Sequence, residues 1–513
     1  MDKRLLDKGW RIDNLYKIRN KEGKLIKFVR NRAQKHFSEN VWHRNLILKS
    51  RQLGFTSFEA IDALDDVLFT PNMDALMIAH NLEAGESIFN KKIVFAWDKL
   101  PMEIRALYGV DAKTSKTLKF DFGKKGFSSI AVDTSGRSGT YQRVHITELA
   151  DIAKKYPKKI PDIIEGTIPA IPTTGRLDIE STSQGAAGEF YEMFTEAWER
   201  GQPTIPQQYK GHFYNWTWDD EELSKIEVPI PVSEMEQSSK FQEYAEKHNL
   251  SARQLTYYYQ KWLSLNKKWN ALKREYPTTP QEAFDAVSEG TFYGETVGIM
   301  EQNGQIGVIP FDRALKVHTV WDLGVGKNMV VGFYQRDTAT NTIRKIDYLQ
   351  GQGSEALPEI VAKVLSKPYV YGKHFGPHDI EATDIGTGKT RTETAQKLGL
   401  RFTLVPEQSI EDGINAVGVW LSRLHVDKLA CKEWLRAMKN YGREWDEKRG
   451  MYKDEPLHNW ASHGADEARY AALCEKLMTN DNQLLNRPFY DQTEDFWNQG
   501  TNNRLNLDTW RNQ

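Results

Sequence analysis

The sequence predicts an α/β protein with a mainly parallel sheet in its first half and a mixed sheet in its second half. Its 513 residues exceed what one hydrophobic core supports, so two or three domains are expected. In the first half, short apolar runs alternate with stretches of helical periodicity, which is typical of a parallel sheet covered on both faces. From Lys316 onward, three closely spaced apolar runs precede helical segments, and this order predicts a mixed sheet.

Apolar runs in the first half mark the predicted parallel strands. They comprise residues 45–50, 75–80, 129–133, 143–148 and 176–181. Residues 83–97, between two of these runs, have helical periodicity and predict a helix. Parallel sheets bind ligands at the carboxyl ends of their strands, so the residues that follow each run are candidates for a site.

The remainder of the chain divides into three further parts. Residues 201–286 are irregular and aromatic, with a helical stretch near 251–262, and this favours a lid or connecting subdomain. The second sheet is expected from strands at 317–322, 329–334 and 343–349 and a helix at 358–365. After about Leu477 the chain is polar, which predicts a mobile or partner-binding tail. The expected parts are therefore 1–200, 201–300, 301–480 and 481–513.

Composition excludes several classes of protein. The chain is 39% hydrophobic and 27% charged, which is ordinary for a globular protein. It has no apolar run of about 18 residues and no apolar signal core, so we expect a cytoplasmic protein that does not contact a membrane. Cys431 and Cys474 are expected to be buried thiols, because two cysteines cannot form a disulfide framework. With a net charge of −1, contact with nucleic acid would require local basic surface.

A phosphate-binding loop is expected directly after the first of these strands. The pattern G-x-x-x-x-G-K-[ST] is met at Gly54 and Thr56, but Phe55 stands in the lysine position and Lys49 in that of the first glycine. The missing positive charge must come from Lys49 or Arg51, and the sequence does not choose between them. Taken alone, the segment is better explained as a plain strand, turn and helix. The residues expected around the phosphates are Lys49, Ser50, Arg51, Gln52, Leu53, Gly54, Phe55 and Thr56.

Neighbouring strand ends supply further candidates. Glu148 ends the run 143–148, where an acid could polarise water for attack on a nucleoside triphosphate. The preceding position, which often holds a magnesium-associated aspartate, is Thr147. The run 176–181 leads into the hydroxyls of residues 181–183, which would sense a γ-phosphate or form a turn. Upstream, Gln34 could offer its amide to an adenine edge. Taken singly, Glu148 is better explained as a solvent-facing acid.

Three aspartates in the second half suggest a second site. Asp322 follows the apolar run 317–321, Asp379 lies in a Pro-His-Asp sequence, and Asp466 lies in the helical segment S462-H-G-A-D-E-A-R-Y470. Carboxylates that converge from strand ends and a helix are what two divalent ions need to cut a phosphodiester. Taken singly, each aspartate is better explained as a surface acid. The weaker candidates are Asp384, as the alternative middle acid, and Asp347 and Glu381.

Two neighbouring features complete this region. His463 lies one helical turn before Asp466, so it either tunes the site or caps the helix. The segment G386-T-G-K-T390 lacks the spacing of a nucleotide loop and is interpreted as a DNA-contacting loop or a turn.

The order of these motifs resembles that of the large terminase subunit of tailed bacteriophages, as far as about Leu477. The segments that carry the resemblance are N31-R-A-Q34, K49-S-R-Q-L-G-F-T56, H145-I-T-E-L149, E180-S-T-S183 and R274-E-Y-P-T-T-P-Q-E-A-F284. The resemblance implies that Gln34 contacts adenine, that Glu148 is catalytic, and that Ser181 with Thr182 couples hydrolysis to movement. It also implies a nuclease metal site at Asp322, Asp379 and Asp466. Thr147 departs from the acidic pair of the family.

This resemblance implies a function for each part of the chain. Residues 1–200 would form a P-loop ATPase core of the ASCE type, 201–300 its lid, and 301–480 a ribonuclease-H-like nuclease. ATP hydrolysis with Mg²⁺ held by Thr56 would drive double-stranded DNA into the procapsid, and the nuclease would cut concatemeric DNA with Mg²⁺ or Mn²⁺. Expected partners are the portal protein, the small terminase subunit and neighbouring copies in a ring, one of which supplies an arginine, Arg137 or Arg143. The protein would act in the host cytoplasm, transiently on the portal, and be absent from the mature virion.

Two other classes of function stay open at this point. The chain could be a P-loop ATPase fused to a ribonuclease-H-like repair or recombination nuclease, which would recognise junctions or damaged DNA. It could also be an assembly factor whose ATP site has decayed, which would not hydrolyse ATP above background. A terminase would instead cut ordinary duplex DNA with little sequence preference.

Overall fold

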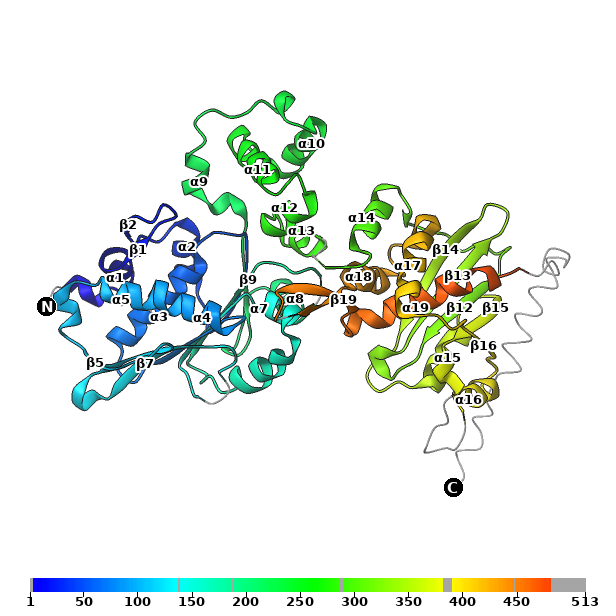
Figure 1. The fold of residues 1–513 in the computed structure, drawn as a ribbon, viewed down its shortest axis with the longest axis horizontal. Coiled ribbons are helices and arrows are strands. Elements are labelled where there is room, and N and C mark those ends of the chain that lie inside the picture. The colour runs from blue at the N-terminus through cyan, green and yellow to red at the C-terminus, as the bar shows by residue number, and fades with distance from the viewer. Residues whose placement is uncertain are drawn as a thin grey trace, which may run out of the picture. The chain divides into compact units, whose positions relative to one another are not determined.

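The computed structural model describes most of the chain, which divides into two compact units (Figure 1). Unit 1 comprises residues 1–291 together with 442–456, and unit 2 comprises residues 292–441 together with 457–513. The finer division into core, lid, nuclease and tail stays a prediction. The described residues are 3–136, 139–186, 188–286, 290–381, 390–446 and 448–480.

Within the described residues, unit 1 is built on an eight-stranded sheet. Its strands, in spatial order, are β10 (Lys210–Tyr214), β3 (Arg44–Lys49), β9 (Arg176–Ser181), β8 (Arg143–Thr147), β4 (Asp74–Ile78), β7 (Phe127–Asp133), β6 (Thr117–Asp121) and β5 (Gly109–Lys113). The strands from β10 to β7 are parallel, and β6 and β5 are antiparallel additions. The order β10-β3-β9-β8-β4 is that of P-loop ATPases of the ASCE type, so the fold class expected for the first half is confirmed.

Both faces of this sheet are covered, because side chains alternate between two cores. Ile47 and Met77 belong to the core on one face, whereas Leu46 and Leu48 belong to the core on the other. Helix α3 (Phe55–Phe69) follows β3 directly and is buried along most of its length. The helix expected at residues 83–97 is present as α4 (Leu82–Ile88), a π-helical stretch (Phe89–Val94) and α5 (Phe95–Asp98).

The expected lid region is a helical bundle with its own aromatic core, which includes Trp216, Tyr258 and Trp262. A capping box of Ser251 and Gln254 begins its longest helix and satisfies free backbone N–H groups there. The helices of this region, drawn in green in Figure 1, are α9 (Asp220–Ser224), α10 (Ser238–His248), α11 (Ala252–Ser264), α12 (Trp269–Glu275) and α13 (Pro280–Asp285).

In its described residues, unit 2 contains a seven-stranded mixed sheet. In spatial order the strands are β11 (Ile306–Gly307), β17 (Leu424–Asp427), β14 (Thr342–Gln350), β13 (Val330–Asp337), β12 (Val317–Asp322), β15 (Tyr371–Gly376) and β16 (Phe402–Leu404). The strands β12, β13 and β14 are antiparallel neighbours, and β15 and β16 run parallel to β12. The central order β14-β13-β12-β15-β16 is that of the ribonuclease-H-like fold, which confirms the fold class expected for the second half.

Helices cover both faces of the second sheet. On one face, α17 (Ile410–Trp420), α18 (Lys432–Asn440) and α19 (Trp460–Cys474) share a core that includes Val320 and Tyr334. On the other face, α15 (Leu357–Leu365) and α16 (Arg391–Lys397) pack over a core that includes Trp321 and Phe333. The expected strands and the expected helix of this half are therefore present.

One hairpin from the second half of the sequence belongs to unit 1. It consists of β18 (Arg443–Asp446) and β19 (Met451–Pro456). The ammonium groups of Lys154 and Lys155, on α7 (Leu149–Lys155), lie 5.6 and 4.9 Å from the ring centroids of Tyr452 and Trp445. Such cation–π contacts attach the hairpin to the helix that follows Glu148.

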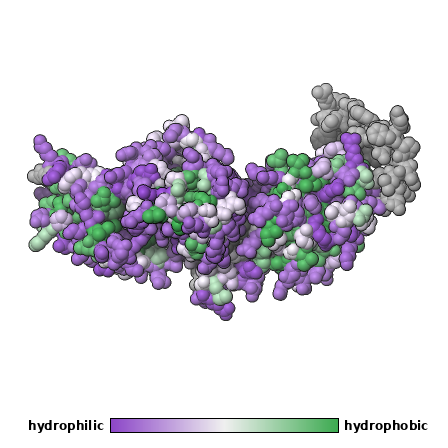
Figure 2. Space-filling model, turned by 90° about the horizontal axis from the view of Figure 1, so that it is seen from above, coloured by the Kyte–Doolittle hydropathy of each residue, from purple (hydrophilic) through white to green (hydrophobic). Residues whose placement is uncertain are grey.

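The face of the protein in Figure 2 is mainly hydrophilic, with scattered apolar residues. No helix in the described ranges combines the length and the apolar character that a membrane span needs. Cys431 and Cys474 are buried as expected, and burial raises the pKa of each thiol to about 12.

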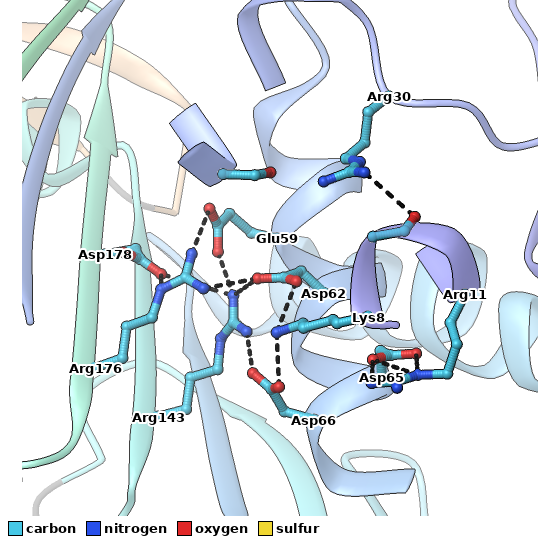
Figure 3. Close-up of polar contacts among 12 residues, drawn as sticks. Lys8, Arg11, Arg30, Glu59, Asp62, Asp65, Asp66, Arg143, Arg176 and Asp178 are labelled. Atoms are coloured by element: carbon cyan, nitrogen blue, oxygen red, sulfur yellow. Dashed lines mark hydrogen bonds and ion pairs between the residues drawn. The ribbon is translucent and has the colours of Figure 1, made fainter. Parts of the chain in front are cut away.

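A buried cluster of charges joins α3 to the sheet (Figure 3). The guanidinium of Arg143, on β8, lies 2.7 Å from Glu59 and 2.6 Å from Asp62, and it also binds Asp66. Arg176, on β9, lies 2.8 Å from Asp62. Burial alone would lower the pKa of Arg143, but the surrounding carboxylates outweigh this effect and raise it well above its ordinary value. The cluster therefore holds α3 in place against β8 and β9.

This cluster corrects one expectation about the arginine supplied to a neighbouring copy. Arg143 is 1% exposed and binds carboxylates of its own chain, so it is not available to another subunit. The other candidate, Arg137, lies outside the described residues.

Replacing Arg143 with methionine should destabilise unit 1, because several carboxylates would stay buried without their cation. Removing one partner of a buried ion pair typically costs about 3–5 kcal/mol. Urea unfolding followed by circular dichroism measures this loss. Lys267→Met is a matched control, since Lys267 and Glu236 form an exposed pair at 2.6 Å, whose loss should cost less than about 1 kcal/mol. Equal losses for the two variants would contradict the structural role given to the cluster.

Candidate functional site

The loop between β3 and α3, where a phosphate-binding loop is expected, forms a tight turn. After the buried strand β3, the backbone N–H groups of Ser50 and Arg51 donate to the carbonyl oxygens of Tyr214 and Glu275, both at 2.8 Å. Gln52 and Gly54 then adopt left-handed conformations, with φ of 68° and 73°. Glycine is favoured at residue 54 because residues with a Cβ rarely adopt this conformation, and an added Cβ would also lie 2.9 Å from the Gln34 amide nitrogen. The turn leads directly into the N-terminus of α3.

Gln34 braces this loop from α2 (Arg32–Asn40). Its Oε1 accepts a hydrogen bond from the backbone N–H of Asn31 at 3.0 Å, and its Nε2 donates to the carbonyl of Gly54 at 3.0 Å. The side chain is 3% exposed. The expected contact of Gln34 with adenine stays a prediction, and it would require these hydrogen bonds to exchange.

Phe55 is part of the hydrophobic core and does not face the loop. It is 1% exposed, and its ring lies 5.8 Å from that of Phe37 and 5.0 Å from that of Tyr214. Leu53 is buried in the same core. The position that usually holds the lysine is therefore committed to packing, and the loop must obtain its positive charge elsewhere.

Lys49 and Arg51 have different surroundings. The Lys49 side chain is 8% exposed, and its Nζ lies 3.1 Å from Oε1 of Glu148 and 3.7 Å from Oε2 of Glu180. Burial alone would lower the pKa of Lys49, but these two carboxylates raise it above its ordinary value. The Arg51 side chain is 60% exposed and pairs with Glu275 at 3.4 Å. Lys49 is therefore the cation beside the expected catalytic acid.

The carboxylate of Glu148 joins the motifs expected on neighbouring strands. Its Oε2 accepts hydrogen bonds from Ser181 Oγ at 3.3 Å, from the Thr182 backbone N–H at 3.0 Å and from Thr182 Oγ1 at 3.2 Å. Glu148 itself has a left-handed backbone with φ of 57°, and such strain in a non-glycine residue often marks a functional position. The structure thus brings together Lys49, Glu148, Ser181 and Thr182.

Glu180 also belongs to the group of side chains around Lys49 and Glu148, and its importance was not predicted from the sequence. Its Oε1 accepts hydrogen bonds from Thr56 Oγ1 at 2.5 Å and from Thr147 Oγ1 at 3.1 Å. Burial alone would raise the pKa of Glu180, but Lys49, the nearby His145 ring and the hydrogen bond from Thr56 lower it to about 2. A charged residue inside the buried run 176–181 was the signal that could have identified it.

The loop also contacts the last residue of α12, a helix of the expected lid region. Ser50 Oγ donates to the carbonyl of Glu275 at 3.0 Å, next to the backbone hydrogen bond from Arg51. Farther along, Glu282 accepts hydrogen bonds from Tyr244 Oη and from the Thr278 backbone N–H, both at 2.7 Å. The bonds from Ser50 and Arg51 make the expected lid region a direct structural neighbour of the loop between β3 and α3.

In unit 2, Asp322 lies at the end of β12 and contacts α19. Its Oδ2 lies 3.0 Å from Nδ1 of His463, and the residue is 9% exposed. The hydrogen bond with Asp322 raises the pKa of His463 above its ordinary value. Asn459 occupies the N-cap of α19, so of the two roles considered for His463 the capping role is wrong.

The other expected nuclease residues are only partly placed. Asp466 pairs with Arg469 of the same helix at 2.7 Å. Asp379 lies in a short helix, His378–Glu381, directly after β15, but its side chain is outside what the structure describes. Among the described side chains, no three His, Cys, Asp or Glu residues form a group that could hold a metal ion. The aspartate trio therefore stays a prediction.

The weaker candidates are placed as follows. Asp347 is engaged by Lys367 at 2.5 Å and by Tyr369 Oη at 3.1 Å, as a structural ion pair would be. Glu381 is exposed. Asp384 and residues 386–389 of the glycine-containing segment lie outside the described residues.

Fold and site together define unit 1 as a P-loop fold of the ASCE type and unit 2 as a ribonuclease-H-like fold. In comparisons with known proteins, no family model and no curated protein matches the chain. Among solved structures, it is similar to the large terminase of a thermophilic bacteriophage in complex with ADP, at 14% identity and a TM-score of 0.30. That alignment covers 88% of this chain and 100% of the bacteriophage terminase chain.

Two single-domain structures each align with part of the chain. The ATPase domain of the Thermus phage P74-26 large terminase aligns at 19% identity over 39% of this chain and 88% of that one, with a TM-score of 0.30. The large terminase nuclease domain from bacteriophage SPP1 with bound Mn aligns at 19% identity over 34% and 96%, with a TM-score of 0.27. Because these TM-scores are low, the functional conclusion rests on the residues of this chain.

Lys49→Met should weaken ATP binding more than Arg51→Met. Lys49 is the buried cation beside Glu148. A charge-assisted hydrogen bond is typically worth about 1.5–3 kcal/mol, or roughly 10- to 100-fold in affinity. Fluorescence titration with a labelled ATP analogue measures both variants. Thermal unfolding of each variant controls for loss of fold. A larger effect for Arg51→Met would assign the missing charge to Arg51.

Proposed function

We propose that the chain is the large subunit of a viral terminase, an ATP-driven motor that moves double-stranded DNA into a procapsid and cuts it. The observation that carries the proposal is that side chains from different strands all contact the carboxylate of Glu148. Glu148 is contacted by Lys49 from β3 and by Ser181 and Thr182 from the end of β9. These are three separate sequence motifs of an ATPase, and they meet at the carboxyl edge of one parallel sheet.

In this proposal, unit 1 binds ATP against residues 49–56. Backbone N–H groups of the turn and the N-terminus of α3 favour phosphate oxygens, and Lys49 adds the positive charge that Phe55 cannot. Gln34 contacts adenine, and Glu148 orients the attacking water. Thr56 is suited to hold Mg²⁺, because its hydroxyl already lies beside a buried carboxylate. When bound, the ion neutralises charge that develops on the phosphates.

Hydrolysis is linked to movement through contacts that already exist in unit 1. Ser181 and Thr182 bond the Glu148 carboxylate, so a change in its partners during turnover reaches β9. Ser50 and Arg51 bond Glu275, so a shift of the loop reaches the lid helices. In a ring docked on the portal protein, a neighbouring copy would supply an arginine, and Arg137 is the remaining candidate.

The second activity proposed is an endonuclease in unit 2. Asp322, Asp379 and Asp466 would hold Mg²⁺ or Mn²⁺, which polarises the scissile phosphate when bound. Support comes from the ribonuclease-H-like strand order and from the position of Asp322 at the end of its central strand. The nuclease would cut concatemeric DNA, with the small terminase subunit as partner, in the host cytoplasm.

Glu148→Gln should abolish ATP turnover while ATP binding is kept. The amide preserves the shape of the side chain but cannot act as a base, and loss of general-base catalysis typically costs about 10²–10⁴-fold in rate. Phosphate release by the purified full chain, with DNA and Mg²⁺, measures turnover. Glu282→Gln, which alters a glutamate of the lid segment, serves as a control for the same chemical change elsewhere in unit 1. Unchanged turnover in Glu148→Gln would show that another residue activates the water.

Asp322→Asn should abolish metal-dependent cleavage of plasmid DNA without affecting ATP turnover. Neutralising a carboxylate that binds the ions removes both charge and a ligand. Gel analysis of linear and supercoiled DNA with Mg²⁺ or Mn²⁺ measures the loss. Asp347→Asn is a matched control, because Asp347 lies in the same sheet but pairs with Lys367. Strong preference for branched over ordinary duplex DNA would instead favour a repair or recombination nuclease.

A further inference from the structure

Unit 1 lacks an acid at the position that usually assists the magnesium ion of a P-loop ATPase. That acid directly precedes the catalytic glutamate on the same strand, and here the position is Thr147. A neutral hydroxyl contributes no charge toward a divalent cation. An active site would therefore need a carboxylate from another element, placed close to Thr56.

Resting on the ATPase function proposed above, we propose that Glu180 is this acid, displaced by one strand. In the sheet, β9 lies between β3 and β8, and Glu180 is the direct pairing partner of Thr147. Paired residues on neighbouring parallel strands direct their side chains to the same face. The carboxylate of Glu180 therefore reaches the space that an aspartate at residue 147 would occupy.

The hydrogen bonds of Glu180 fit the proposed role. Its Oε1 lies 2.5 Å from Thr56 Oγ1 and 3.1 Å from Thr147 Oγ1, so the two hydroxyls beside the expected ion share one carboxylate oxygen. Its Oε2 is buried and makes no hydrogen bond to any described residue. A buried carboxylate oxygen without a hydrogen bond, beside a phosphate loop, can ligate a hard cation or accept a hydrogen bond from one of its waters.

The alternative is that Glu180 only compensates buried positive charge. Lys49 Nζ lies 3.7 Å from its Oε2, and His145 Nε2 lies 3.4 Å from its Oε1. If that were its whole role, neutralising Glu180 would change stability and leave metal affinity unaltered. The two roles therefore predict different results when the metal is measured directly.

The test measures binding of Mn²⁺ in the presence of a non-hydrolysable ATP analogue by electron paramagnetic resonance. The full chain is used, and only the Mn²⁺ signal that depends on nucleotide is counted, because unit 2 is expected to bind Mn²⁺ without it. Glu180→Gln should weaken this Mn²⁺ affinity about 10- to 100-fold, as for loss of a residue that supports a bound metal. Its affinity for the analogue in EDTA should be little changed, because in this proposal Glu180 acts on the metal ion and not on the nucleotide.

Two further variants make the result specific. Asp74→Asn neutralises an acid of β4 that lies outside the charge cluster of Figure 3, and whose Oδ1 accepts a hydrogen bond from Ser129 Oγ at 2.5 Å. It should leave nucleotide-dependent Mn²⁺ affinity unaltered even if it lowers the melting temperature. In the double variant Thr147→Asp, Glu180→Gln, the acid moves to the strand where it is usually found, and the affinity for Mn²⁺ should be restored.

Each outcome distinguishes this proposal from the function on which it rests. Unaltered Mn²⁺ affinity in Glu180→Gln would overturn the proposed role of Glu180, with the ATPase proposal left standing. Absence of nucleotide-dependent Mn²⁺ binding in the unaltered chain would overturn the ATPase proposal itself. If Glu180→Gln does not fold, the double variant decides: a folded double variant without recovered Mn²⁺ affinity would contradict the displacement of the acid by one strand.

Discussion

The buried guanidinium of Arg143 is the contact on which the geometry of unit 1 depends. It projects from β8, the strand that leads to Glu148, and binds Glu59 and Asp62 of α3, the helix that follows the expected phosphate loop. Arg176 extends the cluster to β9, which carries Glu180. Burying several charges is expensive unless all are paired, so the cluster tolerates little relative displacement of these three elements. The loop, Glu148 and the hydroxyls of Ser181 and Thr182 are thereby held in fixed positions relative to one another.

Much of the fold was predictable because buried strands are rich in β-branched and aromatic residues. The runs at 143–148 and 317–322 were recognisable as strands for this reason, and Glu148 and Asp322 were recognisable as site candidates because they end them. The anomaly at Phe55 was also visible. Its cause was not, because only the packing of Phe55 against Phe37 and Tyr214 shows that the side chain is needed in the core.

The remaining site residues depended on the order of strands in the sheet, which no local pattern encodes. Thr147 and Glu180 are 33 positions apart in sequence, and they meet only because β9 inserts between β3 and β8. The sequence contains one sign of the buried Arg143, because Glu59, Asp62 and Asp66 form an acidic stripe along one face of α3. A stripe of this kind is usually solvated, so its burial required knowledge of what lies beneath the helix.

The hairpin β18–β19 affects how the protein can be divided for study. Because it belongs to unit 1, the chain passes between the units three times, after residues 291, 441 and 456. A fragment that ends at Thr291 would leave Lys154 and Lys155 without the rings of Tyr452 and Trp445. A fragment that begins at Phe292 would present those two rings to solvent, as an exposed aromatic surface prone to self-association. Recombinant halves of this protein therefore need the hairpin deleted from one and supplied to the other.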